Sequence, residues 1–199
     1  MLGVEQAWDE LAGRDPAGIC ARAGVEYSEE QGYVVPVFGL PVMLDMKTRT
    51  MTASSPESDF VLAKTAYFSH LSILFYLLRA QKTAPTGRLL KPSELKTSQI
   101  YLQGSHLLPL EPIAARFSSD PEAFLAQAAR FGGQPRQYGD AAVELLPFPR
   151  VPIVLILWRE DDEFAARTYL LFDEVCELQL PPDILWSVAM MCALVMLQR

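Results

Sequence analysis

The longest uninterrupted run of apolar residues lies at 151–157, VPIVLIL, and continues into Trp158. Its short length and its Val and Ile content predict a central β-strand that is apolar on both faces and is therefore buried inside a covered sheet. A second apolar run, ARTYLLF at 166–172, follows the dense acidic turn REDDE at 159–163. This pattern predicts an antiparallel hairpin with an acidic tip.

Shorter apolar runs, broken by Gly and Pro, occupy residues 25–53 and predict a meander of three or four antiparallel strands. Pro36 interrupts one of them, and because proline cannot donate to a strand ladder we expect that strand at a sheet edge or at a bulge. Two further strands are predicted at 97–104 and at 140–148.

A long helix is predicted at 56–80, with Ser55 as its N-cap and Pro56 in its first turn. Its apolar stripe is expected to consist of Phe60, Ala63, Tyr67, Leu71, Leu74 and Leu78. The polar strip opposite is expected to consist of Thr65, Ser69, Ser72, Tyr76 and Arg79. That strip is the solvated outside of an amphipathic helix, or else it lines a cleft whose hydroxyl groups and one cation suit a small anionic ligand.

The remaining helices are predicted from their caps and stops. They cover 7–13, 16–23 behind the N-cap Asp15, 111–117, and 121–131 behind Ser119 or Asp120. A C-terminal helix begins at Pro181-Pro182-Asp183 and is apolar on nearly all sides. Such a helix lies in the core of the chain or forms half of a homodimer interface.

These elements predict an α+β fold in one domain over residues 1–199, with a mixed or antiparallel sheet covered by helices and a buried C-terminal helix. The chain of 199 residues is 50% hydrophobic and 21% charged, which is typical of a globular domain with a sizeable core.

Charge and cysteine content narrow the possible partners and the compartment. The net charge of −7 and the scattered Lys and Arg residues argue against nucleic-acid binding. The apolar segment 60–78 is interrupted by Lys64, and the apolar segment 184–197 is too short to cross a bilayer. We therefore expect a soluble protein without a membrane span. Three widely spaced cysteines, Cys20, Cys176 and Cys192, indicate reduced thiols in the cytoplasm.

The acidic residues are the first candidate site. Asp161 and Glu163 lie at the predicted hairpin tip, Asp173 ends the returning strand, and Asp140 opens the strand at 140–148. Converging carboxylates would suit a divalent cation and a metal-assisted hydrolase or transferase. The alternative is a solvated turn that also discourages edge pairing. Spacings typical of zinc sites, phosphate-binding loops or dinucleotide-binding loops do not occur, so no metal and no cofactor are expected.

Arg150 and Tyr76 complete the candidate ligand-binding residues. Arg150 lies between Pro149 and Val151 at the entry to the most apolar strand. It is expected to form an ion pair with Asp140 or Asp173, or else to bind the carboxylate or phosphate of a ligand. Tyr76 contributes a hydroxyl group on the predicted polar strip.

Several passages of the second half resemble a known family. They are FPRVPIVLILW at 148–158, the D-x-E-F pattern at 161–164, LLFD at 170–173 and LPPDILW at 180–186. They resemble an uncharacterised family of bacterial and archaeal proteins, common in anaerobes, whose domain has no known function. Some of its members carry cysteine-rich iron–sulfur segments, which this sequence lacks. The resemblance implies no activity.

Two functions remain open. The first is a non-catalytic cytosolic accessory domain that binds a small ligand or a protein partner. The apolar C-terminal helix would suit the docking of a protein partner. The second is the metal-assisted hydrolase or transferase that uses Asp140, Asp161, Glu163 and Asp173.

Overall fold

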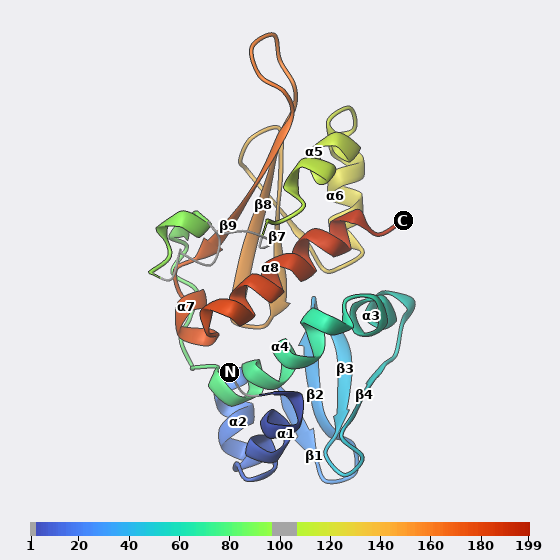
Figure 1. Ribbon diagram of the computed structural model, residues 1–199, viewed down its shortest axis with the longest axis vertical. Coiled ribbons are helices and arrows are strands. Elements are labelled where there is room, and N and C mark those ends of the chain that lie inside the picture. The colour runs from blue at the N-terminus through green and yellow to red at the C-terminus, as the bar shows by residue number, and fades with distance from the viewer. Residues whose placement is uncertain (1–2, 97–106) are drawn as a thin grey trace.

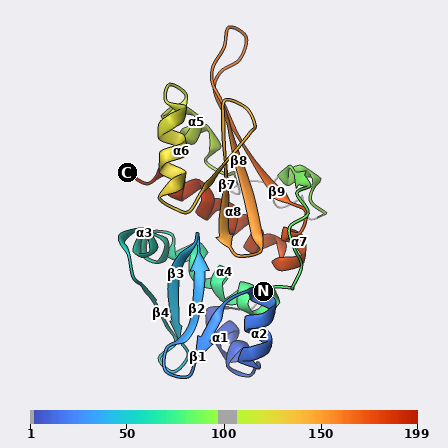
Figure 2. The same ribbon diagram turned by 180° about the vertical axis from the view of Figure 1, so that it is seen from behind.

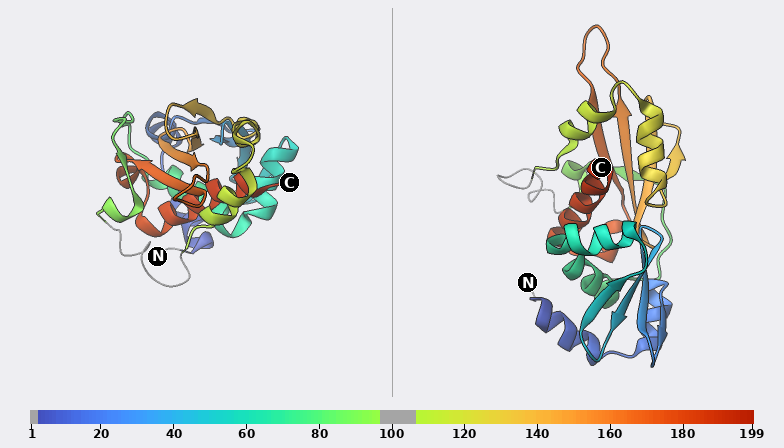
Figure 3. Two further views of the ribbon diagram at one scale, coloured as in Figure 1. Left: turned by 90° about the horizontal axis from the view of Figure 1, so that it is seen from above. Right: turned by 90° about the vertical axis from the view of Figure 1, so that its right-hand side faces the viewer.

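The computed structural model describes residues 3–96 and 107–199 and has an α+β fold with two antiparallel sheets (Figure 1). The sheets follow one another along the long axis of the molecule, and helices pack beside both of them (Figure 3, right). One hydrophobic cluster includes Val35 and Val42 from the first sheet together with Ile153 and Leu155 from the second. The predicted α+β class is confirmed, with the strands divided between two sheets.

The first half of the chain contains α1 (Val4–Ala12), α2 (Pro16–Ala23), β1 (Glu26–Ser28), β2 (Gly32–Val37), β3 (Leu40–Asp45) and β4 (Thr50–Ala53). The four strands pair in the order β1-β2-β3-β4, which confirms the predicted meander. Asp15 caps α2 as predicted, because its carboxylate accepts hydrogen bonds from the amides of Ala17 and Gly18.

Pro36 lies in β2, which is an internal strand of the sheet and carries no bulge at this point. The predicted edge strand is therefore wrong. β1 pairs with β2 only from Gly32 to Val34, so Pro36 lies beyond the end of β1. On its other side Pro36 is opposite Pro41 of β3. A proline is tolerated here because the ladder with β1 has already ended.

The predicted helix 56–80 is broken near its first third. Ser55 caps α3 (Pro56–Asp59) as predicted, and α3 continues into a π-helical turn, η1 (Phe60–Lys64). α4 (Ala66–Arg79) then leaves at an angle of 99°. At the break the hydroxyl of Thr65 donates to the carbonyl of Val61 at 2.6 Å. Such a bond back along the helix offers the backbone an alternative partner and favours bending.

α4 is buried on nearly all sides between residues 72 and 78. Ser69, Ser72 and Tyr76 are fully buried, whereas Tyr67 is 86% exposed. The Ser72 hydroxyl donates to the carbonyl of Phe68 at 2.6 Å, so its polarity is satisfied inside the helix and its small side chain permits close packing. The predicted polar strip on the outside is wrong for these residues, and among them only Arg79 is exposed as expected.

The second half contains β5 (Leu89–Leu90), η2 (Pro92–Glu94), α5 (Leu110–Phe117), α6 (Pro121–Ala129), β6 (Gln134–Arg136), β7 (Ala141–Phe148), β8 (Val151–Trp158), β9 (Arg167–Asp173), α7 (Cys176–Gln179) and α8 (Pro182–Leu197). Its strands pair in the order β5-β9-β8-β7-β6, so the apolar run at 151–157 is the central strand, as predicted. β9 is its antiparallel partner, also as predicted. The predicted strand at 97–104 lies outside the described residues.

In the described parts of the chain, helices cover only one face of the five-stranded sheet. On that face, side chains such as Ile153 and Leu155 of β8 belong to the main core together with helical residues. On the other face, Val154 and Ile156 of β8 form a small separate cluster that contains no helical side chain. Figure 2 shows β7 and β8 with no helix in front of them. Residues 151–157 are all buried, so the predicted burial of this strand is confirmed. The helical cover lies on one face of the sheet, not on both.

Val154 and Ile156 are nevertheless buried, because neighbouring strands and one loop cover them. Ala142, Leu89 and Leu171 contact this pair on the same face. Gly139 has a φ of +55°, and a Cβ atom there would lie 2.7 Å from a methyl carbon of Ile156. The loop can lie this close to the strand because it has a glycine at that position.

α8 lies between the two halves of the chain and contacts α4 on one side and α5, α6 and β7 on the other. Residues such as Leu185, Val188 and Cys192 are fully buried. Of the two predicted roles, the structure supports the core role. Among the described residues no single helix is both long and apolar enough to cross a membrane, and only the bent pair 56–64 and 66–79 reaches that length when both parts are counted together.

Candidate functional site

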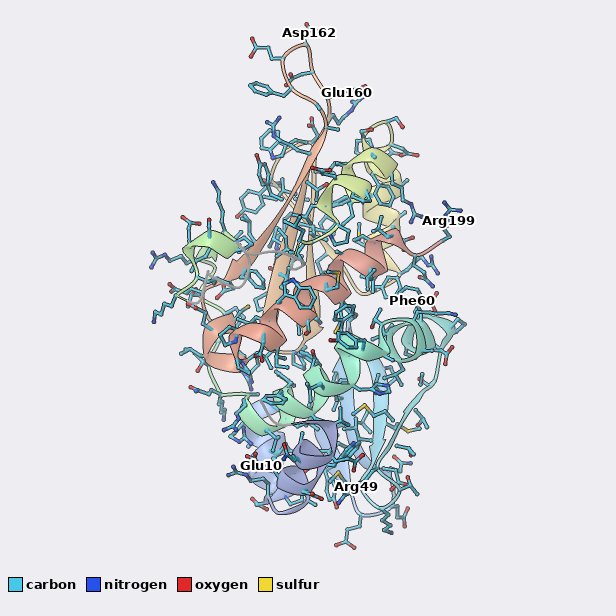
Figure 4. All side chains as sticks on the ribbon, viewed as in Figure 1. Glu10, Arg49, Phe60, Glu160, Asp162 and Arg199 are labelled. Atoms are coloured by element: carbon cyan, nitrogen blue, oxygen red, sulfur yellow. The ribbon has the colours of Figure 1, made fainter. Side chains whose placement is uncertain are left out.

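The structure does not bring the four predicted carboxylates together. Asp161 and Glu163 lie in the hairpin beyond β8 and β9, and the tip of that hairpin extends away from the body of the molecule (Figure 4). Asp173 lies at the opposite end of β9, a strand of seven residues that spans about 20 Å. Within residues 3–96 and 107–199, no group of three or more His, Cys, Asp or Glu side chains is arranged to hold a metal ion.

Asp140 and Asp161 stabilise turns. The Asp140 carboxylate accepts a hydrogen bond from the Arg159 amide at 2.8 Å, where the chain leaves β8. The Asp161 carboxylate accepts hydrogen bonds from the amides of Glu163 at 2.9 Å and Phe164 at 2.7 Å. These two bonds hold the pKa of the Asp161 carboxyl below its ordinary value of 3.8. Such turns within three residues order the hairpin locally.

Asp173 is almost fully buried and fastens the loop before β5 to the end of β9. Its carboxylate accepts hydrogen bonds from the amide and hydroxyl of Thr86, the amide of Gly87 and the amide of Val175. A buried carboxylate needs several donors of this kind, since an unpaired charge in the interior is strongly unfavourable. The Asp173 oxygens are therefore occupied by the protein itself.

Arg150 and Tyr76 meet at the junction between the two halves of the chain. Arg150 was expected to pair with Asp140 or Asp173, but its Nε atom donates to the carbonyl of Arg22 at 2.7 Å. The Tyr76 hydroxyl donates to the carbonyl of Ala23 at 2.6 Å. Both side chains thus bind the last turn of α2, whose terminal carbonyls lack partners within the helix.

The ring of Tyr76 lies flat against Phe148 of β7, with centroids 4.6 Å apart and planes inclined by 9°. Burial raises the pKa of the Tyr76 hydroxyl well above its ordinary value of 10, and the nearby Arg150 charge offsets this only in part. The group is therefore a neutral hydrogen-bond donor in the core. Neither Arg150 nor Tyr76 contacts the sheet face that lacks helices.

Large apolar side chains remain exposed on that face, which we call the open sheet face. Tyr138, Leu146, Trp158 and Tyr169 are each between 38 and 47% exposed. Trp158 follows Val154 by four positions on β8, and Tyr169 pairs with Ile156, so both project on the side away from the helices. A concentration of exposed aromatic residues on one sheet face is typical of a binding surface.

A groove of about 500 Å³ runs over the end of the open sheet face where β8 begins, near Pro149 and Pro152. Its floor is formed by Val154 and Pro152. One wall is the loop at 85–89, which Asp173 holds in place, and the other is formed by residues of β6, β7 and the loop between them. The second wall includes Arg136 and Glu144, Tyr138 and Leu146.

Charged side chains border this surface at both ends. Arg136 and Glu144 form an ion pair across β6 and β7, with a nitrogen–oxygen distance of 2.6 Å. At the hairpin end, the Arg167 guanidinium lies 5.6 Å from the ring centroid of Trp158 and 5.2 Å from that of Phe164. Its NH1 nitrogen is buried and has no hydrogen-bond partner among the described residues. Cation–π contacts of this kind orient the guanidinium and the rings together.

The sequence interpretation missed this surface, although one signal was present. Residues 167–171 alternate between outward Arg167, Tyr169 and Leu171 and inward Thr168 and Leu170. Such alternation is typical of a strand with one face away from the core. The uniform apolar run of β8 hid the same property, because Val154 and Ile156 are covered by neighbouring strands and by one loop.

The structure thus defines an α+β domain whose five-stranded sheet is covered by helices on one face and presents exposed aromatic side chains and a groove on the other. A family model described as a domain of unknown function (DUF3786) matches residues 15–194, so the chain belongs to that family. The predicted membership of an uncharacterised family is confirmed. A search of curated proteins and a search of solved structures each found no match.

Proposed function

We propose that this protein is an accessory domain without chemistry of its own that binds a protein partner on the open sheet face. The observation that carries the proposal is the group Tyr138, Leu146, Trp158 and Tyr169, exposed together on a face with no helical cover. Tyr, Trp and Arg are the residues most often found at the energetic centre of protein interfaces.

The groove supports a preorganised interface. Its loop wall is held by three hydrogen bonds to Asp173, so a partner loses little free energy in ordering that wall on binding. Its floor is apolar, which suits a side-chain anchor from the partner.

Charge favours a partner that is apolar and basic. The hairpin next to Trp158 carries Glu160, Asp161, Asp162 and Glu163 within four residues, and the chain as a whole has a net charge of −7. Complementary charge accelerates association and disfavours the wrong partner. A second copy of this chain would bring the same negative charge, so a different protein is the better occupant.

The cytoplasm is the proposed location. Cys20, Cys176 and Cys192 are free thiols in the structure, and Cys176 and Cys192 are fully buried. Thiols that are not paired are typical of proteins in a reducing compartment.

Site-specific photo-crosslinking in cells of the source organism tests the proposal. A photoreactive phenylalanine derivative replaces Tyr169 on the open sheet face in one strain. In the matched control it replaces Tyr67, an exposed tyrosine on α4. We expect one defined cross-linked protein from position 169 that is absent from position 67. The partner, once identified and purified, should bind the wild-type chain directly.

Affinity measurements with the purified partner complete the test. Tyr169→Ala should weaken binding by about tenfold or more, as for a residue at an interface centre, whereas Tyr67→Ala should leave the affinity within about twofold. Added salt should slow association with a basic partner. Identical cross-links from both positions, cross-links only to a second copy of the chain, or equal effects of the two alanine variants would each refute the proposal.

A further inference from the structure

A second hollow, of about 370 Å³, lies where the end of α4, the short helix α7 and the start of α8 meet. This volume is within the range of sites that bind small molecules. Its apolar lining includes Phe75 of α4, Leu180 between α7 and α8, and Leu185 of α8. The hollow belongs to the helical side of the molecule and shares no lining residue with the groove on the open sheet face.

Arg79, the last residue of α4, provides a cation at this hollow. Its side chain is 49% exposed, and the nearest carboxylate oxygen, from Glu10, is 3.8 Å away. Glu10 has a closer partner in Arg14, at 2.7 Å. Arg79 is therefore only weakly paired within the chain, which leaves its guanidinium available to a ligand anion.

Gln179 provides an amide in the wall of the same hollow. The side chain is fully buried, and its Oε1 atom accepts a hydrogen bond from the Gln81 amide at 2.8 Å. Its Nε2 atom has no hydrogen-bond partner within the described parts of the chain. Because buried donors are almost always paired, this unused amide N–H beside the hollow is a donor that an acceptor from outside the chain would satisfy.

The start of α8 adds a weaker contribution. Pro181 and Pro182 line the hollow at the N-terminus of this sixteen-residue helix. The positive end of the helix dipole favours a negative group nearby. Glu177 also lines the hollow, so an anionic ligand would place its charge towards Arg79 and away from Glu177.

We infer that this hollow binds a small monocarboxylate with an apolar body. The carboxylate lies between the Arg79 guanidinium and the Gln179 amide, where one cation and one neutral donor match a single negative charge. The apolar body packs against Phe75, Leu180 and Leu185. The enclosed volume limits that body to a short alkyl chain or one aromatic ring.

Hexanoate, with hexanamide as its uncharged analogue, is the probe for this site. We expect ¹H–¹⁵N spectra of the labelled protein to show saturable shifts of the Gln179 side-chain amide and of the Leu185 backbone amide with hexanoate. Hexanamide lacks the charge, so its affinity should be lower than that of hexanoate by about tenfold or more. The melting temperature should rise with hexanoate concentration in step with the NMR saturation.

Two arginine variants serve as a matched pair. Arg79→Gln should reduce hexanoate affinity by about tenfold, whereas Arg49→Gln, in the turn before β4 and away from the hollow, should leave it within about twofold. Both arginines are exposed, so each variant should fold. Equal binding of hexanamide, shifts that map away from Gln179, or no saturation at about 10 mM, ten times a Kd of 1 mM, would overturn the inference. Because the groove on the open sheet face is not involved, such a failure would leave the partner-binding proposal standing.

Discussion

The carboxylate of Asp173 accepts a hydrogen bond of 2.6 Å from the backbone amide of Gly87, eighty-six residues earlier in the chain. The same carboxylate also binds Thr86 and the Val175 amide, so it fixes the chain on both sides of the β5–β9 pair. A residue that the sequence marks as a candidate metal ligand is therefore an organiser of one wall of the groove.

Asp173→Asn should destabilise the protein by about 1–3 kcal/mol, because the amide has one acceptor oxygen where four donors converge. Urea denaturation followed by circular dichroism measures the change in the free energy of unfolding. Glu163→Gln, at the exposed hairpin tip, is the control and should change it by no more than about 0.5 kcal/mol. Equal stability of the two variants would contradict the structural role of Asp173.

Tyr76→Phe should cost about 1–3 kcal/mol of folding free energy, since it leaves the Ala23 carbonyl buried without a donor while the stacking on Phe148 is kept. Tyr67→Phe removes an equivalent hydroxyl from an exposed side chain and should be almost neutral. Thermal unfolding of both variants gives the comparison. A neutral Tyr76→Phe would mean that the hydroxyl does not join α2 to α4.

The hairpin turn should weaken at low pH. The folded pKa of Asp161 is lowered, so its hydrogen bonds contribute stability above the unfolded pKa, and this contribution is lost as the pH falls through the folded pKa, below 3.8. An NMR titration of the Glu163 and Phe164 amides should show one step in that range. The step should vanish in Asp161→Asn. A step at or above 3.8 would contradict the two hydrogen bonds.

The thiols should differ in reactivity. Burial raises the pKa of Cys176 and of Cys192 and also shields both sulfur atoms. Cys20 is only partly buried, although burial also raises its pKa. Iodoacetamide at about pH 8 should therefore label Cys20 slowly, and the other two only after denaturation, as mass spectrometry can show. Labelling of Cys192 in the native protein would contradict its place in the core.

Ile153→Asp should prevent soluble folding, because it would place an unpaired carboxylate in the main core. Asp162→Asn, at an exposed position on the hairpin tip, is the control and should express like the wild type. Soluble yield and circular dichroism decide the result. A folded Ile153→Asp protein would contradict the position of β8.

Local signals predicted the elements that local chemistry determines. The strand at 151–157 and its partner at 166–172 are correct because the acidic turn between them is short and its Asp161 orders it. The caps Asp15 and Asp120 are correct because each carboxylate binds amides two or three residues ahead. Such interactions depend on neighbours in the sequence, so the sequence displays them directly.

The errors come from contacts between distant residues. Arg150 binds the carbonyl of Arg22, which lies 128 residues away in the sequence. Its acidic partners were expected from charge alone, and charge does not indicate such a distant contact. The polar strip of α4 is buried because α4 packs against α1 and α2 as well as against α8, which leaves residues 72–78 covered on every side. Whether a sheet face is left without helices depends on where every helix packs, and no single segment of the sequence shows this.

The position of α8 has a consequence for synthesis. Both sheets are made before the helix that joins them, and α8 is the last described element in chain order. A nascent chain that has released all nine strands still lacks the apolar helix against which α4, α5 and α6 pack. Until that helix leaves the ribosome, the apolar inner surfaces of both halves stay exposed to solvent and prone to aggregation. This protein should therefore depend on chaperones during translation more than a protein whose core closes early.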